Sequence, residues 1–163
     1  DPEMSRGLGD VYKRQIYSLM TTLNKAARDA MVKYDVHACT DVTGFGLIGH
    51  TYEMASGSDT EITLNVNDID LIPEALELAR MGILPAGMYR NRTYAEHAVD
   101  AGGTELAKQD MLYDPQTAGG LLIAVAEKDA DALMNDLRGA VPSAQRIGYV
   151  SEYQGGARIK LAH

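Results

Sequence analysis

The segment 39–50 (CTDVTGFGLIGH) constrains the fold of this chain more than any other, because a short apolar run leads directly into a series of glycines. Val36, Ala38 and Cys39 are typical of the end of a short buried strand. The glycines follow at Gly44, Gly46 and Gly49. Because glycine tolerates sharp turns and close approach, this spacing predicts a strand that turns at once into a closely packed helix.

Polar side chains lie between the predicted strand and the predicted helix. Asp41 supplies a carboxylate, and Thr40 and Thr43 supply hydroxyl groups. Carboxylate oxygens suit a hard cation, and free N–H groups at a helix N-terminus suit an anion, so the pattern predicts a site for magnesium and phosphate. Two alternatives stay open. Asp41 can instead cap the helix, and Gly46 and Gly49 can instead serve only close helix–strand packing.

The same glycines also match the spacing of the dinucleotide-binding fingerprint, G-x-G-x-x-G. That fingerprint needs an acidic residue about 20 positions later, at the end of a second strand. Here Asp59 and Glu61 come before the next apolar run, at 62–66, and not after it. The spacing alone is therefore weak support for a dinucleotide site.

A second glycine-rich loop occupies residues 114–120 (DPQTAGG). Thr117 offers a hydroxyl group, and Gly119 and Gly120 permit close backbone approach, so the loop is a second candidate for contact with phosphate. The alternative is a tight turn that leads into a strand beginning at Leu121.

Hydrophobic periodicity predicts the remaining elements. Helices are expected at 16–34, from the glycines to about 55, at 73–81 and at 127–137, with a short one possible at 94–99. Strands are expected at 36–39, 62–66 (half-buried) and 121–125 (central), with a closing pair at 147–150 and 158–161 turned at 155–156. This order indicates an α/β (α+β) fold with helices packed on a mixed, partly antiparallel sheet.

The charge balance excludes some classes of partner. The chain has 15 basic and 23 acidic residues, a net charge of −8, which argues against binding to nucleic acid or to an anionic membrane. No apolar run approaches the roughly 20 residues of a membrane span. The single cysteine, Cys39, excludes an intrachain disulfide and fits a reducing cytoplasm. We expect it to be buried as a small hydrophobe and not to act as a nucleophile.

The arginines and histidines give weaker signals. Arg90 and Arg92 form a close pair in an irregular segment, where they can clamp phosphate or simply be solvated. None of the histidines has the spacing of a zinc site, and His50 is expected to pack or to cap. They are His37, His50, His97 and His163.

Residues 1–15 look foreign to the rest of the chain. They contain few large apolar residues and no clear period, which is typical of a cloning or adapter segment. The expected domain is therefore 16–163.

Two long motifs, TDVTGFGLIGH at 40–50 and DPQTAGGLL at 114–122, resemble the C-terminal half of the selenophosphate synthetase family. The resemblance extends from about residue 16 to the C-terminus, although the family usually has serine where this chain has Ala118. It implies the C-terminal fold of aminoimidazole ribonucleotide synthetase-like enzymes. It also implies that the N-terminal domain, with the catalytic cysteine or selenocysteine and lysine, is absent.

The same resemblance implies an activity: ATP, selenide and water give selenophosphate, AMP and phosphate. Asp41 would bind Mg²⁺ together with carboxylates of the N-terminal domain. The two loops would contact ATP through Thr43, Gly44, Gly46, Thr117, Gly119 and Gly120. The full-length protein would be a cytoplasmic homodimer, and this fragment alone would be inactive and monomeric. The alternatives are a non-catalytic binding or regulatory domain of the same fold, or another ATP-dependent synthetase or kinase of the superfamily.

Overall fold

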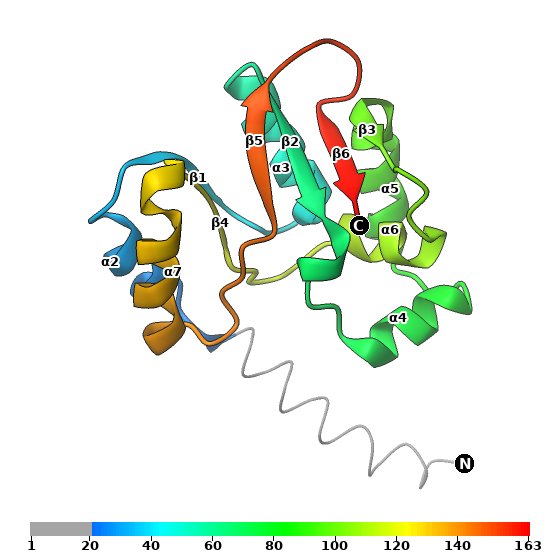
Figure 1. The fold of residues 1–163 in the computed structure, drawn as a ribbon. Helices are drawn as coiled ribbons and strands as arrows, with labels where there is room; N and C mark the ends of the chain where they lie inside the picture. The colour runs from blue at the N-terminus through cyan, green and yellow to red at the C-terminus, as the bar shows by residue number, and fades with distance from the viewer. Residues whose placement is uncertain (1–20) are drawn as a thin grey trace, which may run out of the picture.

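The computed structural model describes residues 21–163 as two sheets with helices packed against them (Figure 1). β1 (Val36–Asp41) and β4 (Leu121–Val125) form an antiparallel pair. The larger sheet has the order β3-β6-β2-β5. Its strands are β3 (Val99–Asp100), β6 (Ile159–Ala162), β2 (Thr60–Asn65) and β5 (Gly148–Glu152). β2 is parallel to β6 and antiparallel to β5, so the predicted mixed sheet with packed helices is confirmed.

The helices form two groups. Beside the β1–β4 pair lie α2 (Lys25–Met31) and α7 (Glu127–Ala140), on the left of Figure 1. The other group comprises α3 (Gly46–Gly57), α4 (Pro73–Arg80), α5 (Ala86–Ala95) and α6 (Leu106–Tyr113), with the 3-10 turns η1 (Val66–Asp68) and η2 (Glu96–Ala98). Helix α3 contacts both β1 and β2 and therefore connects the two parts.

Each group has its own apolar core. Ile62 of β2 and Ile159 of β6 face the helices and pack in one cluster with Ile48 of α3 and Met88 of α5. The second cluster joins α2 to Leu133 and other apolar residues of α7. The predicted glycine-rich turn joins the end of β1 to the start of α3. Because α3 packs in the first cluster, the turn lies between the β1–β4 pair and the larger sheet with its helices.

The environment of β2 differs from the prediction. A half-buried strand was expected, but Glu61 and Thr63, on the face away from the helices, are only 5% and 6% exposed. β2 is central in its sheet, and Lys160 of the neighbouring β6 pairs with the Glu61 carboxylate at 2.9 Å. Central position and cross-strand side chains therefore bury both faces.

Two strand pairings were predicted wrongly. β5 and β6 do not pair with each other, because β2 lies between them. β4 has the predicted bounds, but in the described part of the chain it pairs only with β1 and is not a central strand. Local sequence signals favour hairpins between successive strands, whereas these pairings join distant segments.

Several helix boundaries also differ. Helix α4 and its end at Gly82, which has a φ of +76°, agree with the prediction. The short helix possible at 94–99 is the end of α5 followed by the 3-10 turn η2, whereas the rest of α5 and the whole of α6 were not predicted. The helix predicted at 16–34 is shorter in the structure, since α2 begins at Lys25 and ends at Met31 and residues 22–24 are not helical. The predicted residues 16–20 lie outside the described ones. β1 continues to Asp41, and Cys39 is exposed on it, so its predicted burial is wrong.

Among residues 21–163, no helix has both the length and the apolar character that a membrane crossing requires.

Candidate functional site

The first glycine-rich loop, residues 42–46 from the end of β1 to the start of α3, lies against the second, residues 114–120. The antiparallel pairing of β1 with β4 places Asp41 opposite Leu121, which brings together the segments that follow β1 and precede β4. Backbone hydrogen bonds then join the loops: Val42 N to Gly120 O at 2.9 Å, Gly119 N to Val42 O at 3.0 Å and Gln116 N to the carbonyl of Thr43 at 2.9 Å. Motifs more than 70 residues apart in sequence therefore form one structure.

Two of the glycines are required by this contact. Gly46 has a φ of +71°, and a Cβ there would lie 2.8 Å from backbone atoms of Tyr113 and Asp114. A Cβ at Gly119 would lie 2.1 Å from the carbonyl oxygen of Val42. The close-packing alternative for Gly46 is therefore supported, although its partners are the end of α6 and the first residue of the second loop, and not a strand.

Gly44 and Gly120 are different, because both are exposed and a Cβ at either would meet no atom within 4 Å. Thr117 is also exposed. The open side of the joined loops therefore carries Gly44, Thr117 and Gly120, and a ligand can approach the backbone there.

Asp41 is exposed at the end of β1, beside the joined loops. Within residues 21–163, no side chain caps α3, whose N-cap residue is Phe45, so Asp41 does not serve as its cap. In the same part of the chain, no hydrogen bond or ion pair engages the Asp41 carboxylate. The Thr40 hydroxyl donates to the main-chain oxygen of Asp41, at 3.3 Å, and not to its side chain. An exposed carboxylate without a partner can accept a cation.

A buried histidine of α3 contacts the first glycine-rich loop through the hydroxyl group of Thr43. His50, which is 7% exposed, lies with Nε2 at 3.2 Å from the Thr43 hydroxyl oxygen and Nδ1 at 2.9 Å from a carboxylate oxygen of Glu53. The expectation that His50 packs is confirmed, but its polar contacts on both sides were not predicted.

Asn91 of α5 is a further residue that sequence reasoning missed. Its side-chain amide donates hydrogen bonds to the carbonyl oxygens of Gly44 and Tyr113, both at 2.9 Å. Asn91 is 6% exposed, and it ties the first loop to the end of α6, where the second loop begins. An asparagine inside a helix gives no sequence signal for such a role, because its partners depend on the tertiary fold.

Comparison with known proteins agrees with this architecture. The family described as AIR synthase related protein, C-terminal domain, matches residues 5–160. The chain belongs to this family. The match begins within residues 1–15, and the interpretation of that segment as foreign stays a prediction, outside the described residues.

The curated relatives of this AIR synthase related domain include selenide, water dikinases. Those of Clostridium botulinum (strain Eklund 17B / Type B) and Clostridioides difficile (strain 630) are 45% and 47% identical over 84% and 83% of the chain, and each match covers 40% of the relative. That of Treponema denticola is 46% identical over 77% of the chain and 35% of the relative. The predicted resemblance is confirmed, and the chain spans about two fifths of the length of these relatives.

Asp114, at the start of the second loop, has a buried side-chain oxygen, Oδ1, that lacks a hydrogen bond among the described residues. Burial raises the pKa of the Asp114 carboxyl, because the charged form is poorly solvated.

Replacing Asp114 by asparagine is expected to raise the melting temperature at about pH 7, because the amide carries no charge to desolvate. Since the folded-state pKa is raised, ionisation costs stability above that pKa and costs none below the unfolded value. The advantage of Asp114→Asn should therefore shrink as the pH falls to about 3. Thermal unfolding across this range, with Asp131→Asn on the exposed surface of α7 as control, checks the result. A difference that did not change with pH would contradict it.

The two arginines do not form a phosphate clamp in this structure. Arg90 is exposed, whereas Arg92 pairs with Asp110 at 2.5 Å and lies 4.7 Å above the centre of the Tyr113 ring. Both belong to α5 and not to a loop. Residues two positions apart on a helix do not face each other, so the pair cannot converge on one anion.

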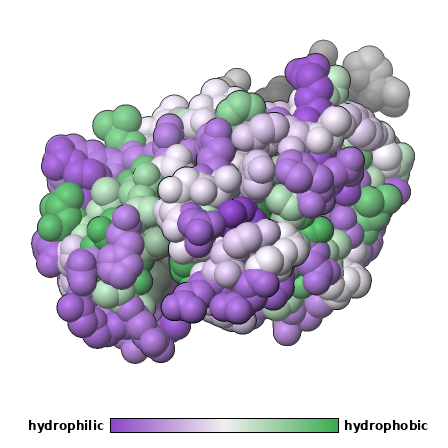
Figure 2. Space-filling view, turned by 90° about the horizontal axis from the view of Figure 1, so that it is seen from above, coloured by the Kyte–Doolittle hydropathy of each residue, from purple (hydrophilic) through white to green (hydrophobic). Residues whose placement is uncertain are grey.

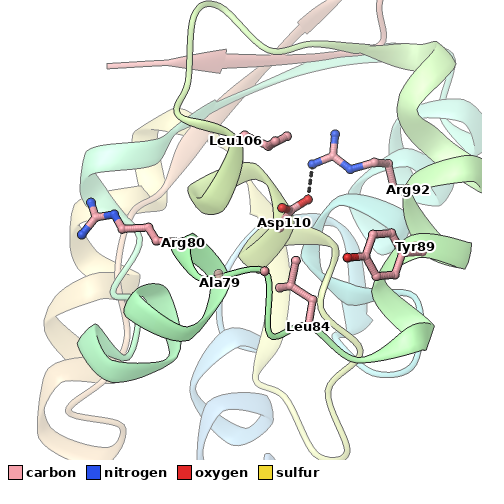
Figure 3. Close-up of a pocket in the computed structure, with 8 residues that line it drawn as sticks. Ala79, Arg80, Leu84, Tyr89, Arg92, Leu106 and Asp110 are labelled. Carbon is pink, nitrogen blue, oxygen red and sulfur yellow. Dashed lines mark hydrogen bonds and ion pairs between the residues drawn. The ribbon is translucent and has the colours of Figure 1, made fainter.

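A hollow of about 400 Å³ lies between α4, α5 and α6 (Figure 3). Its basic side chains are already paired, Arg92 with Asp110 and Arg80 with Glu77 and Glu105. Among the described residues that line the hollow, no basic side chain is therefore free to bind a phosphate.

On the face seen in Figure 2, hydrophobic residues form separate small patches among hydrophilic ones.

The other candidate residues lie apart. His97 contacts the hydroxyl group of Tyr52 and His163 that of Thr104, and among residues 21–163 no three His, Cys, Asp or Glu side chains gather as a metal site. Partial desolvation, helped by the charge of Asp41, raises the pKa of the Cys39 thiol. A raised pKa disfavours the reactive thiolate, which agrees with the expectation that Cys39 is not a nucleophile.

Proposed function

We propose that this chain acts as the C-terminal domain of a selenide, water dikinase and helps to bind magnesium and ATP. The observation that carries the proposal is the union of the two glycine-rich loops beside Asp41, whose exposed carboxylate has no partner within residues 21–163. The names and coverage of the relatives support it. The reaction of the whole protein would convert ATP, selenide and water to selenophosphate, AMP and phosphate.

Asp41 would supply one magnesium ligand. As the family resemblance implies, the other carboxylates would come from the part of the protein that the relatives have in addition. Bound magnesium would neutralise phosphate charge, which this domain needs because its own net charge is −8. The Asp41 carboxylate would hold the cation next to the two loops.

The loops would hold the phosphate end of ATP in two ways. Gly44, Thr117 and Gly120 have room for direct contact on the open side. The N–H groups of Gly46 and Gly119 are already bonded, to Thr43 O and Val42 O, so these two glycines would shape the loops and would not donate to phosphate. Thr43 would contribute its hydroxyl group.

The remaining part of the protein would supply the catalytic cysteine or selenocysteine and the lysine. The full-length enzyme would be a cytoplasmic homodimer whose dimer contacts lie mainly in that part, and this chain alone would be an inactive monomer. A tight dimer of the chain in light scattering would contradict the last point.

Replacing Asp41 by asparagine is expected to weaken magnesium-dependent ATP binding by about tenfold or more, because one charged metal ligand is lost. The protein for this test is a chimaera in which this chain replaces the matching part of the Clostridioides difficile relative. Calorimetry measures binding, and chromatography measures AMP formed from ATP and selenide.

Asp131→Asn is the matched control, since it removes the same charge from an exposed position on α7. It should change neither binding nor AMP formation. A folded chimaera that does not bind ATP with magnesium contradicts the proposed function. Binding that is unaffected by Asp41→Asn would instead favour a domain of the same fold without this metal site.

A further inference from the structure

The side chains of Thr43, His50 and Glu53 form a polar chain, a continuous series of polar contacts that begins in the first glycine-rich loop. Glu53 lies one turn after His50 on α3, and its carboxylate contacts Nδ1 at 2.9 Å, while Nε2 lies 3.2 Å from Thr43 Oγ1. Positions three apart share a helix face, which aligns the two helical members. The third member lies outside the helix, in the turn that leads to it.

The protons in this chain follow from its chemistry. An ionised Glu53 carboxylate only accepts hydrogen bonds, so Nδ1 of His50 carries a proton. Nε2 then accepts the Thr43 hydroxyl proton when the imidazole is neutral and donates to Thr43 Oγ1 when it is charged. In the first state the Thr43 oxygen keeps only lone pairs, which suit a cation, and in the second it keeps its proton, which it can donate to a phosphate oxygen. In both states the contact with His50 holds the hydroxyl oxygen in one position.

Core packing alone does not account for a histidine here. His50 is 7% exposed, and its ring lies 5.6 Å from that of Phe45. An apolar side chain would fill the same space without the cost of desolvating two ring nitrogens. The polar chain therefore points to a role at its outer end, which is the Thr43 hydroxyl.

The backbone of Thr43 is fixed as well. Its carbonyl oxygen accepts hydrogen bonds from Gly46 N at 3.1 Å and from Gln116 N at 2.9 Å. The adjacent carbonyl of Gly44 is held by Asn91. With the main chain held on both sides, the side-chain torsion is the main freedom left at Thr43, and the His50 contact restrains it.

The position next to Thr43 is open, and Thr43 itself is partly exposed. Gly44 is exposed, and a Cβ there would meet no atom within 4 Å. A fixed hydroxyl group next to open space, on a loop held by neighbouring hydrogen bonds, is the arrangement expected of a preorganised ligand contact.

We propose that His50 and Glu53 are positioning residues that hold the Thr43 hydroxyl toward the phosphate groups of ATP bound with magnesium. The inference rests on the proposed function and adds two residues to its site. His50 acts through Thr43 and touches no ligand itself.

A double-mutant cycle in the chimaera tests this coupling. Thr43→Val removes the hydroxyl group at nearly constant shape, and His50→Gln keeps a polar group but loses the contact with Glu53. Each is expected to weaken magnesium-dependent ATP binding about tenfold, the loss of one hydrogen bond to a charged group. The double variant should bind no more weakly than Thr43→Val, because His50 has no hydroxyl left to position. Thr43→Ser, which keeps the hydroxyl group, should restore most of the affinity.

Glu53→Gln and Thr43→Val form a second double-mutant cycle, which leaves the buried His50 unchanged. The Glu53 side chain is 42% exposed, so its replacement should not prevent folding. Melting temperatures of all variants separate stability from affinity. If His50→Gln and Glu53→Gln lower the melting temperature but leave affinity unchanged, the role is structural and the inference fails. Equal losses of affinity with and without the Thr43 hydroxyl would also overturn it. If the unmodified chimaera does not bind ATP, the proposed function fails and the inference fails with it.

Discussion

The Gly119→Ala variant is expected to lose about 3 kcal/mol of unfolding free energy, because the new methyl group has no space. An ideal Cβ at Gly119 would lie 2.1 Å from the carbonyl oxygen of Val42, which is also the acceptor of the Gly119 N–H at 3.0 Å. Backbone cannot rotate away as a side chain can, so the two loops must separate. Urea unfolding measures the loss, which should also lower the melting temperature by about 10 °C.

Gly120→Ala is the matched control in the adjacent position. It makes the same chemical change where a Cβ would meet no atom within 4 Å, so its effect on stability should stay within about 0.5 kcal/mol. Similar losses in both variants would show that flexibility of the whole loop, and not the contact with Val42, controls stability. A silent Gly119→Ala would mean that the loops are not joined as described.

The difference between these two glycines shows how far the sequence alone could lead. The local motif DPQTAGG placed both in a candidate phosphate loop, because glycine is the residue that permits close backbone approach. Which glycine faces protein and which faces open space depends on the pairing of β1 with β4, two strands about 80 positions apart. No local pattern encodes that pairing.

The helices show the same limit. Helix α4 could be predicted because Pro73 begins it and Gly82 follows its end, both local signals. Helix α5 has Gly87 near its start and buries Asn91, so its pattern of apolar residues is weak. Helix α6 buries Asp110, which pairs with Arg92 of α5. Polar residues buried by tertiary partners remove the periodicity from which helices are predicted.

Asp41 and Asn91 illustrate the two kinds of residue in the candidate site. Asp41 could be proposed as a magnesium ligand because a carboxylate next to glycines suits a cation, although the helix-cap alternative stayed open until the structure placed Phe45 at the N-cap of α3. Asn91 could not be identified in this way, since an amide is informative only when its partners are known. Those partners, the carbonyls of Gly44 and Tyr113, belong to segments that the fold brings together. The residues that hold a loop in place are therefore harder to predict than the residues on its open side.

Replacing Asn91 by aspartate is expected to be at least as damaging as Gly119→Ala, with a loss of about 3–5 kcal/mol at about pH 7. The change is nearly isosteric, but a carboxylate has no proton to donate. Its oxygens would face the carbonyl oxygens of Gly44 and Tyr113 at a site that is 6% exposed. A buried charge without a partner would then push the first glycine-rich loop away from the end of α6.

The dependence on pH separates this cause from a simple packing defect. Burial beside two carbonyls raises the folded-state pKa of the introduced carboxyl, so the penalty is present above that pKa and is relieved below the unfolded value of about 3.9. Urea unfolding at about pH 7 and about pH 3 should show the Asn91→Asp variant recovering much of the loss in acid, where the protonated carboxyl can donate to one of the two carbonyl oxygens. The control, Asn135→Asp on the exposed face of α7, should show almost no loss at either pH. A loss that is equal at both values would mean that the charge of the introduced carboxylate is not its cause, and would contradict this account.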